Sequence, residues 1–342
     1  MVDPKDIDFY SLRFEFMETK TMFVSDFKNG KWDEGKLVPF GNFEISPAAC
    51  VLNYGQGIFE GMKALRAKSG EITLFRPQEN GKRFNTSAKR MLMPEYDIDK
   101  FIKVIKEVVK ENEAYIPPYD SGGALYIRPM LFGNGPMLGV ASAKEFKLII
   151  FTVPVGPYFP EGFKGIDLEI SKKYTRAAPG GTGSIKTICN YAGTMFPAKE
   201  AKARGFAQII YLDAVNSEFI EEVGAANFFG IIDGKLATPL KTGTILEGIT
   251  RESVLEIAAK KLDIAVEERD ISYTELFEDT CTEVFCTGTA AVITPVASIA
   301  LEDQKKTYNN REPGEFTKKL YKLLTGIQYL EIEDEFGWIV KV

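Results

Sequence analysis

The 342-residue chain contains no histidine. This absence excludes Ser-His-Asp and Cys-His nucleophilic systems, histidine-based zinc sites and acid/base catalysis by histidine. An enzyme built from this sequence must move protons with Lys, Glu, Asp, Tyr or Cys, or it must use an organic cofactor.

Cysteine is also scarce. The four residues, Cys50, Cys189, Cys281 and Cys286, form no C-x-x-C pair, so neither a disulfide framework nor a zinc ribbon is indicated, and we expect no bound metal. No apolar run reaches about 18 residues, and the acidic start MVDPKDIDFY lacks the apolar region of a signal peptide. The net charge of −6 argues against nucleic-acid and anionic-membrane partners. We expect a cytoplasmic location.

The composition is that of an ordinary globular protein, with 45% hydrophobic and 26% charged residues, and the length suggests two domains. The stretch PVGPYFPEGFKG is rich in proline and glycine and predicts an interdomain loop over residues 154–165. The sequence therefore predicts a small α+β domain over residues 1–153 and a larger domain over residues 166–342.

Hydrophobic periodicity and turn residues predict the main elements of both domains. In the first domain we expect strands over 124–132 and 145–155, and helices over 76–92 and over 100–115, the second capped by Asp97 or Asp99. In the second domain we expect strands over 208–212, 227–233 and 235–238, with a tight hairpin turn at Asp233-Gly234, and a helix over 250–262 capped by Thr250. Pro197 should kink the helix that follows Tyr191 or place its start near Thr194, and Gly205 should end it.

Lys186 stands in the glycine-rich segment GGTGSIKTICNYAG, from Gly180 to Gly193. A phosphate loop of the G-x-x-x-x-G-K-[ST] type fails here, because Ile185 occupies a required glycine position. The dinucleotide fingerprint G-x-G-x-x-G also fails at Gly133 and Gly135, which fit a turn between strands better. Most lysines are solvated, but a lysine beside pyridoxal phosphate fits a chain without histidine, since the ring carries the electrons and the lysine carries the proton.

Eight segments, in order, resemble the branched-chain aminotransferases, members of the class IV pyridoxal-phosphate-dependent aminotransferases. They are YGQGIFEGMKAL (54–65), FRPQENGKR (75–83), LYIRP (125–129), GPYF (156–159), GSIKTICNY (183–191), EEVGAANFF (221–229), EGITRE (247–252) and CTGTAAVITPV (286–296). The resemblance implies a fold type IV enzyme, with a smaller N-terminal α+β domain and a larger C-terminal domain whose β-barrel-like sheet core is flanked by helices.

The resemblance also implies roles around pyridoxal 5′-phosphate. Lys186 forms a Schiff base with the cofactor and then carries the proton, and Glu222 pairs with the pyridine nitrogen. Tyr191 hydrogen-bonds the ring oxygen. The phosphate is held by Arg83, the backbone N–H groups of Ile249 and Thr250 at a helix start, and the Thr289 hydroxyl. Taken from the residues alone, Glu222 is one of two adjacent carboxylates in a loop, and its choice over Glu221 rests on its register with the family pattern.

For the substrate, the resemblance implies that Thr289 and Ala290 bind the α-carboxylate. An apolar pocket for the branched side chain is formed by Phe59, Tyr126, Tyr158 and, from the neighbouring subunit of a homodimer, Tyr54. Arg128 shares a strand face with Tyr126, where it either holds the tyrosines in place or meets the γ-carboxylate of glutamate.

The expected reaction is reversible transfer of the amino group from L-leucine, L-isoleucine or L-valine to 2-oxoglutarate, by ping-pong half-reactions through pyridoxamine phosphate. It serves either the synthesis or the degradation of these amino acids. A D-amino-acid aminotransferase and an aminodeoxychorismate lyase share the lysine and the glutamate, but the segments around Tyr54 and Tyr126 favour the branched-chain enzyme. A non-catalytic pyridoxal-phosphate carrier would need no substrate carboxylate site, and the Gly288–Ala291 turn speaks against it.

Overall fold

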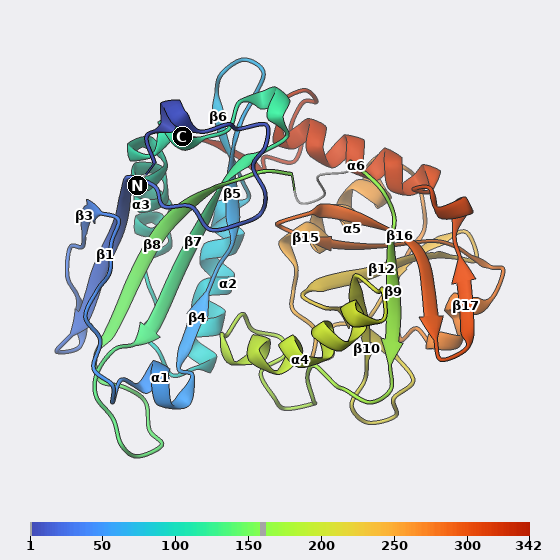
Figure 1. The fold of residues 1–342 in the computed structure, drawn as a ribbon, viewed down its shortest axis with the longest axis horizontal. Helices are drawn as coiled ribbons and strands as arrows, with labels where there is room; N and C mark the ends of the chain where they lie inside the picture. Colours follow the sequence, from blue (N-terminus) through green and yellow to red (C-terminus); the bar gives the residue numbers. More distant parts are fainter. Residues whose placement is uncertain (1, 158–161) are drawn as a thin grey trace. The chain divides into compact units, whose positions relative to one another are not determined.

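The computed structural model describes residues 2–157 and 162–342. The chain divides into two compact units (Figure 1). The first contains Met1–Pro160, Ile185–Cys189 and Ile327–Val342, and the second contains Glu161–Ser184 and Asn190–Gly326. Two segments that the sequence placed in the 166–342 domain, one of them carrying Lys186, therefore belong to the first unit.

The first unit is built on a nine-stranded antiparallel sheet. Its main path runs β18-β6-β5-β7-β8-β1-β2, with β3 beside β1 and β4 beside β7. Its strands are β1 (Thr21–Lys28), β2 (Lys31–Trp32), β3 (Lys36–Pro39), β4 (Gly57–Phe59), β5 (Met62–Arg66), β6 (Ile72–Phe75), β7 (Ala124–Gly133), β8 (Phe146–Val155) and β18 (Ile339–Lys341). Its helices are α1 (Cys50–Tyr54), α2 (Pro77–Arg90) and α3 (Ile98–Glu111), with short 3-10 turns at Pro4–Asp6, Glu113–Tyr115 and Tyr119–Ser121.

The helix α3 shows how the sequence pattern produces this unit. Its apolar stripe, which includes Phe101, Ile105 and Val109, is buried in the main core. The Asp97 carboxylate accepts a hydrogen bond from the Lys100 N–H at 2.7 Å, so the predicted cap is confirmed.

The second unit closes part of its sheet into a barrel. The strands β11-β10-β9-β16-β15-β12 are consecutive neighbours, and β12 also pairs with β11, which completes a ring of six. The α+β first unit and the barrel-like sheet of the second, flanked by helices, confirm the predicted fold class. The strands are β9 (Ile166–Ser171), β10 (Gln208–Leu212), β11 (Ile220–Val223), β12 (Ala226–Ile232), β13 (Lys235–Thr238), β14 (Val266–Glu268), β15 (Cys281–Gly288), β16 (Val292–Leu301) and β17 (Gln304–Thr307). The helices are α4 (Cys189–Ala203), α5 (Ile249–Lys261) and α6 (Glu315–Gln328), with 3-10 turns at Tyr273–Phe277 and Asn309–Arg311.

Two predicted helix starts are wrong. The α5 cap is Gly248 rather than Thr250, which lies buried in the first turn. The α4 helix begins at Cys189 and contains Pro197, so the start near Thr194 is wrong, while the alternative of a kink at Pro197 stays a prediction. The Asp233-Gly234 hairpin is confirmed, since both residues have positive φ, at 49° and 73°, as this tight turn requires.

Among the described residues, no helix is long and apolar enough to cross a membrane.

Candidate active site

Lys186 lies on a short extended segment beside β4. Its carbonyl accepts a hydrogen bond from the Phe59 N–H at 3.1 Å, and its own N–H donates to the Ser87 Oγ at 3.0 Å. Thr187 forms an antiparallel bridge with Ile58. These contacts fix the backbone on both sides of the lysine, and they explain why this segment belongs to the first unit.

The amine of Lys186 lies in a poorly hydrated, charged environment. Its Nζ is 4.7 Å from the centre of the Phe59 ring. Loss of hydration lowers the pKa of Lys186 below its ordinary value of 10.5, and the Arg83 charge lowers it further, while Glu60 and Tyr126 act in the opposite direction. A larger neutral fraction is what an amine nucleophile requires.

Aromatic rings and a guanidinium surround this amine within the first unit. The Arg128 guanidinium carbon is 4.7 Å from the Phe59 ring centre and 5.2 Å from that of Tyr126, and its Nη2 donates to the Tyr126 hydroxyl at 3.2 Å. Of the two roles predicted for Arg128, holding the tyrosine therefore has a direct contact. A Cβ on Gly61 would lie 2.0 Å from the Tyr126 hydroxyl, so this position of the β7 tyrosine requires a glycine there.

Arg83 lies on α2 and is paired with a residue to which the sequence analysis gave no role. Its Nε and Nη2 donate to the two carboxylate oxygens of Glu60 at 2.7 and 2.9 Å. Glu60 was visible only as a charged residue in the otherwise apolar segment GIFEGM. Nothing in the sequence shows that it meets an arginine 23 positions later.

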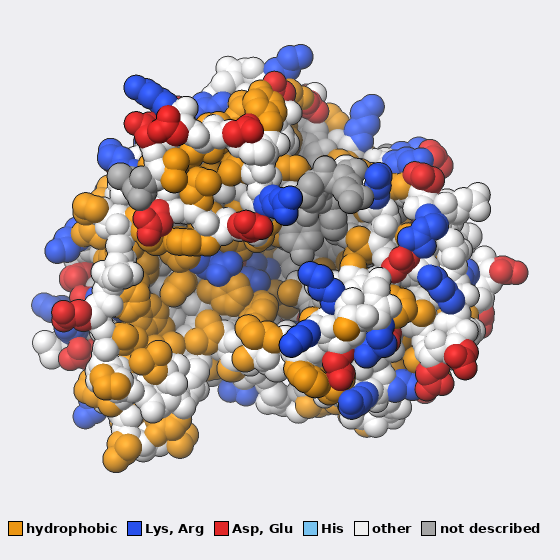
Figure 2. All heavy atoms as spheres, in the orientation of Figure 1, with side chains coloured by type: hydrophobic (Ala, Val, Ile, Leu, Met, Phe, Trp, Pro, Cys, Tyr) orange, Lys and Arg blue, Asp and Glu red, His pale blue; other side chains and the backbone are white. Residues whose placement is uncertain are grey.

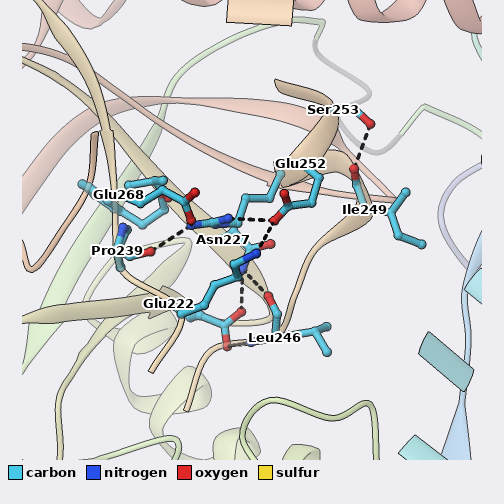
Figure 3. Close-up of polar contacts among 12 residues, drawn as sticks. Glu222, Asn227, Pro239, Leu246, Ile249, Glu252, Ser253 and Glu268 are labelled. Atoms are coloured by element: carbon cyan, nitrogen blue, oxygen red, sulfur yellow. Dashed lines mark hydrogen bonds and ion pairs between the residues drawn. The ribbon is translucent and has the colours of Figure 1, made fainter. Parts of the chain in front are cut away.

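Glu222 lies on β11 in the second unit, and Asn227 lies opposite it on the neighbouring strand β12 (Figure 3). The Asn227 side chain donates to its Oε1 at 3.1 Å, and the Leu246 N–H donates to its Oε2 at 3.4 Å. The Arg176 guanidinium forms an ion pair with the same carboxylate, and only 3% of the Glu222 side chain is exposed. These contacts hold the buried carboxylate in one orientation, and Arg176 balances its charge.

The alternative of two exposed carboxylates in a loop is wrong, because Glu221 is also on β11 and buried. One of its oxygens, Oε2, is buried without a hydrogen-bond partner. Burial raises the pKa of Glu221 above its ordinary value of 4.5, against the opposing effects of Thr244 and Arg176. The two neighbouring glutamates therefore have different environments, and the one predicted to hold the cofactor is the one paired with arginine.

The remaining predicted residues have defined places. Ile249 and Thr250 begin α5, where the first N–H groups of a helix have no intrahelical acceptor. Thr289 and Ala290 form the turn between β15 and β16. Tyr191 lies in α4, and Tyr54 lies exposed on α1. Tyr158 lies outside the described residues.

Other contacts of the site were not predicted. Arg176, which pairs with Glu222, precedes the glycine-rich segment in RAAPGG, and Asn227 was quoted only as part of the EEVGAANFF segment. Among the described residues, no group of three or more cysteines and carboxylates is placed to hold a metal ion.

The raised pKa of Glu221 should be measurable through the stability of the protein. A folded-state pKa above the unfolded value means that stability declines as pH rises from about 4.5 through the raised pKa. Glu221→Gln removes this decline, so its free energy of unfolding relative to the unaltered chain should increase as pH rises above about 4.5 in urea titrations. A difference that stays constant as pH rises would contradict a raised pKa of Glu221.

Comparison with known proteins places this chain in a family. Residues 57–299 match the family described as amino-transferase class IV. A branched-chain-amino-acid aminotransferase of Haemophilus influenzae is 44% identical, and the match covers 99% of each chain. A chloroplastic branched-chain-amino-acid aminotransferase of Arabidopsis thaliana is also 44% identical, over 98% of this chain and 80% of its own length. A methionine aminotransferase of the same plant is 40% identical, over 98% of this chain and 94% of its own length.

The fold agrees with these sequence matches. The crystal structure of the branched-chain amino acid aminotransferase of Escherichia coli superimposes with a TM-score of 0.79. It is 28% identical, and the match covers 94% of this chain and 99% of that one. The chain belongs to the class IV aminotransferases, among the branched-chain aminotransferases.

Proposed function

We propose that the chain transfers the amino group of L-leucine, L-isoleucine or L-valine reversibly to 2-oxoglutarate, giving the branched 2-oxo acid and L-glutamate. The observation that carries this proposal is the Lys186 amine, whose pKa is lowered by loss of hydration and by Arg83, in a chain of this family. An amine that loses its proton readily can bond to an aldehyde carbon and can later accept and return a proton.

The residues fit pyridoxal 5′-phosphate as the cofactor. Lys186 would form the covalent bond, the buried carboxylate of Glu222 would pair with the pyridine nitrogen, and Tyr191 would hydrogen-bond the ring oxygen. Arg83, the N–H groups of Ile249 and Thr250, and the Thr289 hydroxyl would hold the phosphate. When bound, the cofactor supplies an electron sink for the bond broken at the substrate Cα.

The chain's own groups supply the rest of the chemistry. The Lys186 amine would move a proton between the substrate Cα and the cofactor carbon C4′. Glu222, balanced by Arg176, would keep the ring nitrogen protonated. Thr289 and Ala290, in the tight turn after β15, would bind the α-carboxylate through N–H groups.

The side-chain specificity would come from the aromatic residues. Phe59 and Tyr126 lie about the Arg128 guanidinium, and Tyr158 and the partner subunit's Tyr54 complete the proposed pocket. An apolar pocket distinguishes one methylene by about 1–3 kcal/mol, so all three branched amino acids should react. Arg128 gives a 2-oxoglutarate γ-carboxylate a cationic partner.

Methionine is a second candidate donor. The 40% identical methionine aminotransferase supports it. The methionine side chain is also apolar, and its unbranched, flexible stem adapts to irregular apolar space. A pocket of aromatic rings that accepts leucine would therefore offer methionine similar contacts.

Borohydride tests the role of Lys186. With pyridoxal phosphate bound, reduction should attach the cofactor permanently to the unaltered chain and leave Lys186→Ala unlabelled, as read by intact-protein mass spectrometry. The matched control is Lys63→Ala, a second lysine with a pKa lowered to about 8, which should still be labelled. Labelling of Lys186→Ala at the unaltered level removes the lysine from this role.

A donor panel tests the substrate class. Purified protein with added pyridoxal phosphate and 2-oxoglutarate should produce glutamate from leucine, isoleucine and valine with kcat/KM values within about 200-fold of one another. Methionine in place of all three would support the second candidate. D-alanine as the best donor would contradict both.

The proposal includes a homodimer, supported by an apolar surface on the first unit. Leu52, Tyr54, Leu138 and Val140 are exposed there, and the Tyr54 hydroxyl donates to the Leu138 carbonyl. Figure 2 shows hydrophobic side chains at its lower left, where α1 and the loop after β7 lie. Leu138 and Val140 are 93% and 90% exposed. Aliphatic side chains that gather in one exposed patch are typical of a protein–protein interface.

The patch leads to a test of the dimer. The double variant Leu138→Asp/Val140→Asp should convert a particle of twice the chain's mass into one of a single chain, by light scattering, because charges oppose burial of the patch. Val215→Asp, at an exposed apolar residue of the second unit, is the control and should remain dimeric. A single-chain mass for the unaltered protein contradicts the dimer.

The cytoplasm is the proposed location. The four cysteines of the chain are free, which is typical of a protein in a reducing compartment. Recovery of the protein in an organelle fraction of its source cells would contradict this proposal.

A further inference from the structure

Glu60 is the most completely buried charged group near Lys186. None of its side chain is exposed. Its two oxygens accept hydrogen bonds from Arg83 Nε at 2.7 Å, Arg83 Nη2 at 2.9 Å, Asn80 Nδ2 at 2.7 Å and the Gly61 N–H at 3.1 Å. Three of these bonds end on Oε2 and one on Oε1, so both oxygens of the buried carboxylate have donors.

These contacts fix the guanidinium of Arg83. The edge that carries Nε and Nη2 faces Glu60 in the fork arrangement, and only 11% of the arginine side chain is exposed. Because a guanidinium is planar, holding one edge sets the direction of the whole group. Glu60 itself lies on the two-residue link that continues β4 into β5 along β7, and its N–H donates to the Pro129 carbonyl at 2.9 Å, so its backbone is fixed by the sheet.

Glu60 also acts on Lys186 through charge. Burial opposes ionisation of Glu60, but the charge and hydrogen bonds of Arg83, followed by the charge of Lys186, hold its pKa below the ordinary value. The groups that face the Lys186 amine are Arg83 and Arg128, which favour loss of its proton, and Glu60 and Tyr126, which oppose it. An ionised Glu60 therefore offsets part of the effect of the two arginines.

We propose that Glu60 is a positioning residue with two separable effects: its buried carboxylate aims the Arg83 guanidinium at the cofactor phosphate, and its negative charge offsets the positive charge of Arg83 beside Lys186. The inference rests on the proposed function, since it assumes that Lys186 and Arg83 meet one cofactor. It adds a residue that touches neither substrate nor cofactor.

The two effects predict opposite results for two aldehydes. Covalent binding requires the neutral amine to attack the aldehyde carbon. A carbon–nitrogen double bond replaces the carbon–oxygen double bond, the oxygen leaves as water, and the proton of the lysine ammonium passes to solvent. Pyridoxal phosphate needs both the amine and Arg83, whereas pyridoxal, which has no phosphate, needs only the amine.

The experiment measures binding of both aldehydes by absorbance as a function of pH, for the full chain and for Glu60→Gln. We expect Glu60→Gln to bind pyridoxal phosphate about tenfold more weakly, because an amide cannot hold the guanidinium by two charge-assisted bonds. The same variant should bind pyridoxal undiminished at neutral pH, with the pH midpoint of binding moved downward, because the charge that kept the lysine protonated is gone.

Three further variants separate the two effects. Glu79→Gln is the matched control, because Glu79 is a carboxylate on α2 that pairs with exposed Lys82 at 2.8 Å. It should leave the binding of both aldehydes unchanged. Glu60→Asp keeps the charge, so it should weaken pyridoxal phosphate and leave the pyridoxal midpoint in place. Arg83→Lys, which leaves Glu60 intact, should do the same and serves if Glu60→Gln does not fold.

Two results would overturn the inference and leave Glu60 with a merely structural role. One is that Glu60→Gln weakens the binding of both aldehydes equally, and the other is that the pH midpoint of pyridoxal binding does not move. Absence of binding at Lys186 in the unaltered chain is a different result, because it would remove the proposed function and the inference together. Normal binding by the unaltered chain with no effect of Glu60→Gln would remove the inference alone.

Discussion

The chemistry of this protein depends on an amine that is kept from full hydration beside two arginines. Solvated lysine holds its proton near neutral pH and is a poor nucleophile. Here the backbone around Lys186 is joined to β4, and the lysine amine lies over Phe59, with Arg83 lowering its pKa. The sheet of the first unit thus creates the reactive state of a side chain that would be inert at the surface.

Charge balance limits how many cations can be buried beside the Lys186 amine. Two unopposed guanidinium groups near one amine would cost much free energy to bury, and Glu60 compensates Arg83 through its charge and two hydrogen bonds. The second unit also contains a buried ion pair, in which an arginine balances the carboxylate that has the proposed role. There Glu222 is the buried carboxylate and Arg176 its cation, while burial raises the pKa of the adjacent Glu221.

Local patterns were sufficient for elements whose signals lie within a few residues. The strand over 208–212, the Asp233-Gly234 turn and the Asp97 cap agree with the structure because side-chain alternation, positive φ and a capping carboxylate are local properties. Thr250 was chosen as a cap for its hydroxyl, but the chain turns into the helix at Gly248, where a Cβ would lie 2.0 Å from the Asn227 side chain. Pro197 lies inside α4 and is buried there, although proline has the lowest helix propensity of the residues.

The predicted site residues came from family motifs, and their roles remain predictions that the geometry supports unevenly. Lys186 has the environment that its role needs, and so does Glu222. What the motifs could not supply was the partners: Glu60 for Arg83, and Arg176 and Asn227 for Glu222. These pairs join residues 5 to 46 positions apart, and only the register of strands and the placement of α2 bring them together. The same limit applies to Lys186 itself, since its contacts with β4 and α2, both distant in sequence, are what join it to the first unit.

The protonation of Lys186 is the most direct test of this account. Its pKa can be measured in the cofactor-free chain by NMR of isotopically labelled lysine side chains, with the signal assigned by its loss in Lys186→Ala. The account predicts a pKa clearly below the ordinary value of 10.5. A Lys186 amine that titrates at or above that value would contradict it, because the fold would then confer no special reactivity on the residue to which the function is assigned.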